Sequence, residues 1–183
     1  MRETKRYIIT GTSCSGKTAT CKELLGLGYI VMPEMARKLI REEEAKEHGD
    51  LPWNSKNMFQ TKLFVRQEAL EYQIKDIPEV ILDRGLIDNL AYCRVYGVDK
   101  LDNAFNSTHL DCWNRYDLVF LLEPLPFRND AQRRETPEQA QQIHQEIIKA
   151  YNKFGYKPMH VPVETPEERA MHIDWIIQQH KEG

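Results

Sequence analysis

Residues 11–18 constrain this chain most, because they have the complete spacing G-x-x-x-x-G-K-[ST] of a phosphate-binding loop. They follow an apolar stretch typical of a strand, residues 7–9, and precede a stretch typical of a helix. Glycines let the backbone bend so that successive N–H groups point into one concavity and bind phosphate oxygens. The helix that begins here adds the positive end of its dipole to the same anion site. The segment therefore predicts binding of a nucleoside triphosphate.

The side chains of this loop predict separate roles around the triphosphate. We expect Lys17 to reach the β- and γ-phosphates and the Thr18 hydroxyl to bind Mg²⁺. The N-K-x-D sequence that selects guanine in many GTPases has no match, since residues 152–155 lack the acid. ATP is therefore the default nucleotide, with Mg²⁺ as its metal. The expected nucleotide-binding residues in the loop are Gly11, Ser13, Cys14, Ser15, Gly16, Lys17 and Thr18.

Composition narrows the class of protein. The chain has 183 residues, 41% of them apolar and 29% charged, which is typical of a soluble globular protein with one domain, residues 1–183. The net charge of −3 argues against nucleic acid as the main partner. No apolar run is long enough for a transmembrane segment, no signal peptide is evident, and the four cysteines form no C-x-x-C pair. We expect a cytoplasmic protein; the oligomeric state stays open.

Strand-like and helix-like patterns alternate along the chain. This alternation predicts a three-layer α/β/α fold with a five-stranded, mostly parallel sheet, whose ligands bind at the carboxyl ends of the strands. Thr136 and Thr165 each precede Pro-Glu, a strong start for a helix. The expected strands are residues 6–10, 29–32, 80–83, 118–122 and 159–163. The expected helices are residues 16–27, 34–48, 55–75, 86–96, 103–114, 137–154 and 166–180.

Asp83 and Arg84 follow the third expected strand directly. An acid at the end of a buried strand is a natural partner for the Mg²⁺ held by Thr18, and the alternative is an aspartate that caps the next helix. Arg84 can stabilise the charge on a transferring phosphoryl group. The alternative is a structural arginine paired with the C-terminus of a helix.

Polar side chains after the second strand and on the third helix are candidates for contact with an acceptor. Glu34 can accept a proton from an acceptor hydroxyl or hydrogen-bond it, and Arg37 lies one turn later on the same face. Alternatively, Glu34 is there because the helix dipole favours an acid in the first turn. Gln60 and Gln67 are seven residues apart on one helix face and are expected to contact a polar acceptor.

Three arginines lie in a polar connection after the fourth strand. Such a connection can form a lid that closes over the triphosphate and excludes water. We expect Arg128 and Arg133 to act on the phosphoryl group and Arg134 to bind the nucleotide, although the sequence leaves open which arginine contacts phosphate. The alternative is a solvated, charged loop.

Several motifs together resemble one known family. Residues 11–18, 33–37, 51–53, 83–88, 116–124, 155–156 and 161–163 are similar to the NadR-kinase-like "AAA domain" family of small P-loop NTPases, which includes the TRPL-translocation-defect-type proteins. The resemblance covers nearly the whole chain. It implies the fold of a nucleoside or nucleotide kinase, with Asp83 and Arg84 as its DR-type motif and Arg128, Arg133 and Arg134 in its lid.

Two functions fit these observations. The first is a kinase that transfers the γ-phosphoryl group of ATP·Mg²⁺ to a hydroxyl or phosphate of a small, nucleoside- or nucleotide-like acceptor. The second is a regulatory switch that binds ATP or GTP and thereby changes its affinity for a protein or an anionic lipid. Acceptor-dependent release of ADP distinguishes the two.

Overall fold

The computed structural model of the chain describes residues 4–107, 111–125 and 135–182. Five strands form one sheet in the order β2-β3-β1-β4-β5, and each of the four pairings is parallel. The predicted five-stranded α/β sheet is confirmed. The strands are β1 (Lys5–Thr10), β2 (Val31–Met32), β3 (Glu79–Asp83), β4 (Leu118–Leu122) and β5 (Met159–Val161).

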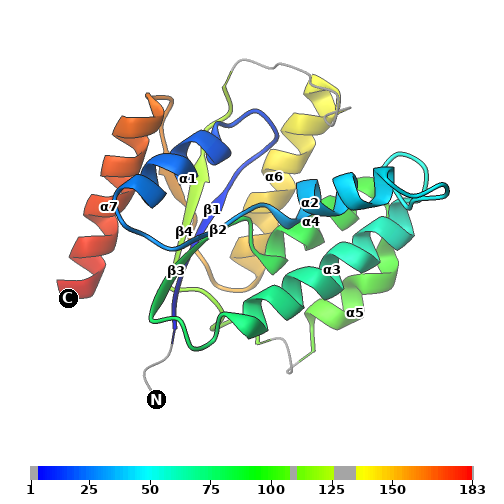
Figure 1. Cartoon of the computed structure of the whole chain (residues 1–183), viewed down its shortest axis with the longest axis horizontal. Coiled ribbons are helices and arrows are strands. Elements are labelled where there is room, and N and C mark those ends of the chain that lie inside the picture. The colour runs from blue at the N-terminus through cyan, green and yellow to red at the C-terminus, as the bar shows by residue number, and fades with distance from the viewer. Residues whose placement is uncertain (1–3, 108–110, 126–134, 183) are drawn as a thin grey trace.

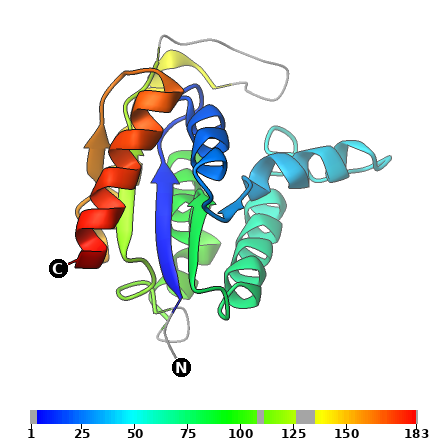
Figure 2. The ribbon, with the colours of Figure 1, turned by 60° about the vertical axis from the view of Figure 1, so that its left-hand side comes forward.

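Helices cover both faces of the sheet, so the three layers are as expected (Figure 1). α1 and α7 lie on one face, and α4 and α6 pack together on the other, with α3 beside α4. α2 contacts α3 and extends away from the sheet, as Figure 2 shows. The helices are α1 (Lys17–Gly26), α2 (Met35–Glu44), α3 (Lys56–Gln73), α4 (Leu86–Tyr96), α5 (Asp102–Phe105), α6 (Pro137–Lys153) and α7 (Pro166–Glu182).

The apolar residues of β1 divide between two cores because successive side chains of a strand point to opposite faces. Ile8 is buried in the cluster formed with α4 and α6. Tyr7 and Ile9 are buried in the cluster formed with α1 and α7. The central strand therefore lies between two buried layers, which explains its continuous apolar sequence.

The two predicted helix starts are confirmed. The Thr136 hydroxyl accepts a hydrogen bond from Gln139 N at 3.2 Å, and Gln139 Oε1 accepts one from Thr136 N at 2.9 Å. Thr165 and Glu168 make the same reciprocal pair at 3.2 and 3.0 Å. Both are capping boxes, which satisfy backbone N–H groups that a helix start leaves without partners.

The predicted helix over residues 103–114 is wrong. Among the described residues of this range, only the single turn α5, which follows the short turn η1 (Asp99–Leu101), is helical, and Asn106 ends it. Asn106 and Ser107 favour turns over helix because their side chains compete for local backbone groups. Asp111 has φ of 41°, which no helix continues through.

Several further boundaries differ from the expected ranges: β5 ends at Val161 rather than residue 163, and α3 ends at Gln73 rather than residue 75. The second strand is limited to Val31–Met32, although Ile30 O still accepts a hydrogen bond from Ile81 N at 2.9 Å. α2 ends at Glu44 rather than residue 48. In the described part of the chain, no helix is long and apolar enough to cross a membrane.

Candidate functional site

The phosphate loop, residues 11–18, connects β1 to α1 at the carboxyl edge of the sheet. Gly11 and Gly16 have φ of 140° and 82°, values that favour glycine, and Cys14 has φ of 65°. A Cβ on Gly11 would lie 2.8 Å from both Leu122 O and Ser15 Oγ. The two glycines of the motif are therefore required by the shape of the loop.

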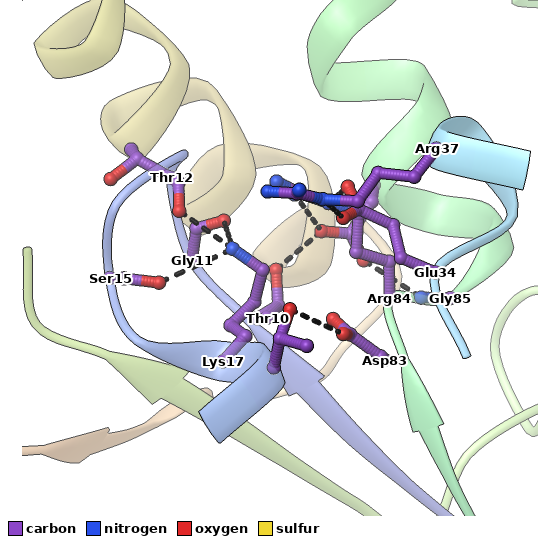
Figure 3. A network of polar contacts seen from close by, with 12 residues as sticks. Thr10, Gly11, Thr12, Ser15, Lys17, Glu34, Arg37, Asp83, Arg84 and Gly85 are labelled. Carbon is purple, nitrogen blue, oxygen red and sulfur yellow. Dashed lines mark hydrogen bonds and ion pairs between the residues drawn. The ribbon is translucent and has the colours of Figure 1, made fainter. Parts of the chain in front are cut away.

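Lys17 is folded into this loop (Figure 3). Its ammonium group donates to Gly11 O at 3.0 Å, Thr12 O at 2.6 Å and Ser15 Oγ at 3.3 Å. Burial, helped by the positive charge of Arg84, lowers the pKa of Lys17 to about 8. At neutral pH Lys17 is still mostly protonated, and its charge lies where phosphate oxygens would enter the loop.

Asp83 and Thr18 lie together, as the sequence predicts for a metal pair. Thr18 Oγ1 donates to Asp83 Oδ2 at 3.5 Å, a long hydrogen bond. Asp83 Oδ1 is buried and has no hydrogen-bond partner among the residues that the structure describes. Burial raises the pKa of Asp83 to about 6 against the attraction of Lys17.

This pair fits Mg²⁺, a hard cation that prefers oxygen ligands and keeps several waters. The buried carboxylate oxygen without a partner is available to the ion or to one of its waters. No group of three or more His, Cys, Asp or Glu side chains in the described part of the chain could hold a metal. The remaining ligands of a bound ion would therefore be phosphate oxygens and water.

Glu34 joins two arginines on the other side of the loop. Its Oε1 accepts from Arg84 Nε and its Oε2 from Arg37 Nε, both at 2.9 Å. Burial opposes ionisation of Glu34, but the charges of Arg84 and Lys17 outweigh it and lower the pKa of Glu34 to about 2. Glu34 precedes α2 and makes no side-chain cap there, so its partners are the arginines rather than the helix start.

Arg84 is held by contacts from several elements. It has φ of 75°, an uncommon value for a residue with a Cβ. Arg84 N donates to Ile9 O at 3.0 Å, and Arg84 O accepts from Gln67 Nε2 at 3.2 Å. Its guanidinium lies 5.0 Å from the centre of the Tyr92 ring. These contacts direct the charged group of Arg84 toward Glu34 rather than toward a helix C-terminus.

Asp88 also belongs to the site, although it is not among the residues expected from the sequence. Its carboxylate accepts from Arg84 Nη1 at 3.3 Å, Gly85 N at 2.9 Å and Tyr151 OH at 2.6 Å, and also from Thr10 Oγ1. Through Gly85 N, Asp88 caps α4, the role that the alternative interpretation gave to Asp83. The spacing G-x-x-D at the start of a helix could have indicated it.

Gln60 and Gln67 are both buried on α3, and both line the cavity beside the loop. Gln60 Oε1 accepts from Asn89 Nδ2 at 2.6 Å. Gln67 Nε2 donates to Glu71 Oε1 at 3.0 Å as well as to Arg84 O. The amide nitrogen of Gln67 is thus already used within the protein, whereas Gln60 forms a polar pair with Asn89 at the cavity wall.

A cavity of about 750 Å³ joins these groups, a size typical of small-molecule sites. Residues of the phosphate loop line it, together with aromatic rings and a lysine. Leu125 and Glu135, the described residues on either side of the expected lid, also line it. Arg128, Arg133 and Arg134 lie outside the described residues. Other lining residues are Glu34, Arg37, Trp53, Lys56, Phe59, Gln60, Gln67, Arg84, Asp88, Asn89, Tyr92 and Tyr96.

A parallel sheet with this loop after its central strand defines a P-loop NTPase. The chain belongs to the AAA_28 family, described as an AAA domain, whose model matches residues 6–169. The family-level resemblance seen in the sequence is thereby confirmed. No curated protein matches the chain significantly.

Solved structures of kinases share the fold. NadR in complex with NR has a TM-score of 0.75 at 16% identity, with 97% of this chain and 50% of that chain covered. Deoxyadenosine kinase from M. mycoides with bound dATP has a TM-score of 0.67 at 16% identity, covering 94% and 99%. Shikimate kinase from Aquifex aeolicus has a TM-score of 0.57 at 17% identity, covering 94% and 96%. At these identities the likeness concerns the fold.

Proposed function

We propose that this protein is a kinase that transfers the γ-phosphoryl group of ATP·Mg²⁺ to a small, nucleoside- or nucleotide-like acceptor. The observation that carries this proposal is that one cavity joins the phosphate loop to the largely covered carboxylate of Glu34. A kinase needs both a triphosphate site and an acceptor site within one enclosed space. The bound dATP and NR of two proteins with this fold support a nucleoside-like acceptor.

On the nucleotide side, the backbone N–H groups of the loop bind the phosphate oxygens. The ammonium group of Lys17 exchanges Gly11 O and Thr12 O for oxygens of the β- and γ-phosphates. Thr18 and Asp83 would hold Mg²⁺, which would neutralise charge on the phosphates. Lys17 thus gains stronger acceptors than the carbonyls it contacts without nucleotide.

On the acceptor side, Glu34 orients a hydroxyl of the acceptor and does not remove its proton before phosphoryl transfer begins. A carboxylate with a pKa of about 2 is a weak base but a good hydrogen-bond acceptor. Phosphoryl transfer needs little base strength because its transition state is loose, so position and charge dominate. The acceptor oxygen forms a bond to the γ-phosphorus while the bond to the leaving ADP oxygen breaks, and the proton of an acceptor hydroxyl passes to Glu34 late in the transfer and from there to water. Arg84, next to Glu34, stabilises the charge on the migrating group.

Other parts of the cavity complete the proposed site. Arg37 and the Gln60–Asn89 pair contact polar groups of the acceptor, and the aromatic rings contact its flat or apolar part. The contacts expected of Arg128, Arg133 and Arg134 with the phosphates stay a prediction, because these residues lie outside the described part of the chain. Exclusion of water from the cavity favours transfer to the acceptor over hydrolysis.

The test is ADP formation from ATP·Mg²⁺ with a panel of nucleosides, nucleotides and other hydroxylated small molecules. We expect one class of acceptor to raise the rate well above the rate with ATP alone, and Lys17→Ala to abolish this increase. A slow rate that no acceptor changes would contradict a kinase and favour the nucleotide-dependent switch.

A further inference from the structure

A buried arginine outside the cavity contacts the phosphate loop from behind. Arg169, in the first turn of α7, is 1% exposed. Its Nη1 donates to Ser15 O at 2.5 Å, its Nε to Pro162 O at 2.7 Å and its Nη2 to Glu123 O at 3.2 Å. One guanidinium thus connects the loop to the segments that follow β4 and β5.

Arg169 differs from Arg84, the other arginine that is buried in the described part of the chain, and from the largely covered Arg115. Arg84 and Arg115 each pair with carboxylates. The hydrogen bonds of Arg169 within the described residues go to carbonyl oxygens. Buried charged groups are normally paired, but in the described part of the chain Arg169 makes no direct ion pair, and the carboxylates of Glu164 and Glu123 attract it only from a distance. This charge lies directly against the loop that would bind a polyanion.

The contact with Ser15 O also fixes the orientation of one peptide group. In a trans peptide, the C=O of one residue and the N–H of the next point in opposite directions. The C=O of Ser15 points at Arg169, so the N–H of Gly16 points away from it. Ser15 and Gly16 line the cavity, whereas Arg169 is not among its lining residues. The fixed N–H therefore points toward the side of the loop where phosphate would bind.

We propose that Arg169 is a positioning residue for the nucleotide: it holds the Ser15–Gly16 peptide in the orientation that binds phosphate. This inference rests on the proposed binding of a triphosphate at the loop. Arg169 has no contact with Glu34 or Arg37, the residues of the acceptor side, so its effect is confined to the nucleotide.

The test uses two variants. Arg169→Lys keeps the charge, but an ammonium group cannot reach the three carbonyls that the planar guanidinium contacts. Arg169→Gln keeps two N–H donors but loses the charge. We expect KM for ATP to rise about tenfold in Arg169→Lys and further in Arg169→Gln, since charged hydrogen bonds are the stronger ones. KM for the acceptor should change less than about twofold, because the acceptor groups are untouched.

Thr165→Ala is the matched control. It removes the cap of α7, one turn before Arg169, and leaves the guanidinium in place. We expect it to lower the melting temperature without weakening ATP binding. If Arg169→Lys binds ATP as tightly as the wild type, or loses affinity for ATP and acceptor equally, the inference is wrong. If the wild type binds no ATP, the proposed function itself is wrong. If only the inference about Arg169 is wrong, the wild type still binds ATP, so the two failures are distinguishable.

A measurement on the wild-type protein tests the inference even if the variants do not fold. In protein labelled with ¹⁵N-arginine, the Nε–H signal of Arg169 should shift and exchange more slowly with solvent when a nonhydrolysable ATP analogue binds. Binding of the analogue with no change in this signal would contradict the inference.

Discussion

Replacing Glu34 by glutamine should lower the free energy of unfolding at pH 7 by about 3 kcal/mol. The pKa of Glu34 lies near 2 in the folded protein instead of the ordinary 4.5. A difference of one pKa unit corresponds to about 1.4 kcal/mol, so a shift of this size is worth about 3 kcal/mol. The side chain is 14% exposed, so solvent screens its contacts with Arg84 and Arg37 only weakly.

The sign of this effect predicts its pH dependence. Because the folded pKa is lowered, the stabilisation is complete above about pH 4.5 and is lost as the pH falls toward 2. The difference between wild type and Glu34→Gln should therefore be largest at neutral pH and fall to about half near pH 3. Urea denaturation at several pH values measures it.

Glu42→Gln is the matched control, since Glu42 also pairs with an arginine, Arg66, but is 39% exposed. Exposed pairs contribute little, so its unfolding midpoint should stay close to that of the wild type. Equal stability of Glu34→Gln and wild type at pH 7, or a difference that does not vary with pH, would refute the electrostatic account of Glu34.

Three further variants test the nucleotide side. With ATP·Mg²⁺ near 100 times Kd, the melting temperature of the wild type should rise by about 5–10 °C, and Lys17→Ala should remove this rise. Lys22→Ala, on the exposed part of α1, should keep it. Equal shifts of the two variants in a melting scan would contradict the role of Lys17. Asp83→Asn should raise the melting temperature of the protein without nucleotide, because it removes a carboxylate that burial disfavours. In a calorimetric titration the same variant should bind nucleotide more weakly in the presence of Mg²⁺. Unchanged affinity would exclude Asp83 from the metal site. Gly11→Ala should lower the free energy of unfolding by about 1–3 kcal/mol, because the φ of Gly11 is strained for other residues and a Cβ would lie 2.8 Å from Leu122 O. Gly26→Ala should be tolerated in the same denaturation assay, because in the described part of the chain a Cβ on Gly26 would meet nothing within 4 Å beyond the backbone of its own helix.

The sequence predicts the parts of this fold that depend on local pattern. The loop, the parallel sheet and the two capping boxes follow from glycines, apolar runs and Thr-Pro-Glu sequences at fixed spacing. The helix expected over residues 103–114 fails because its pattern contains turn-forming residues, of which Asn106 ends α5 after one turn. Periodicity alone does not weigh such competition.

The sequence predicts individual residues of the site but few of the contacts between them. Glu34, Asp83 and Arg84 follow strand ends, which the carboxyl-edge rule identifies. The i,i+3 spacing of Glu34 and Arg37 indicates that they lie together, but the contact of Glu34 with Arg84 depends on how α2 packs, and no spacing in the chain encodes it. Arg169 lies 154 residues from Ser15, and only the folded sheet brings them into contact. Contacts of this kind arise from tertiary structure, so the sequence pattern does not contain them.

Transfer of labelled phosphate from γ-³²P-ATP tests most directly whether one cavity serves both substrates. We predict that the label appears on an acceptor with a hydroxyl or phosphate group, in amounts equal to the ADP formed, and that Lys17→Ala stops the transfer. Label released only as inorganic phosphate, at a rate that no acceptor changes, would contradict the proposed kinase.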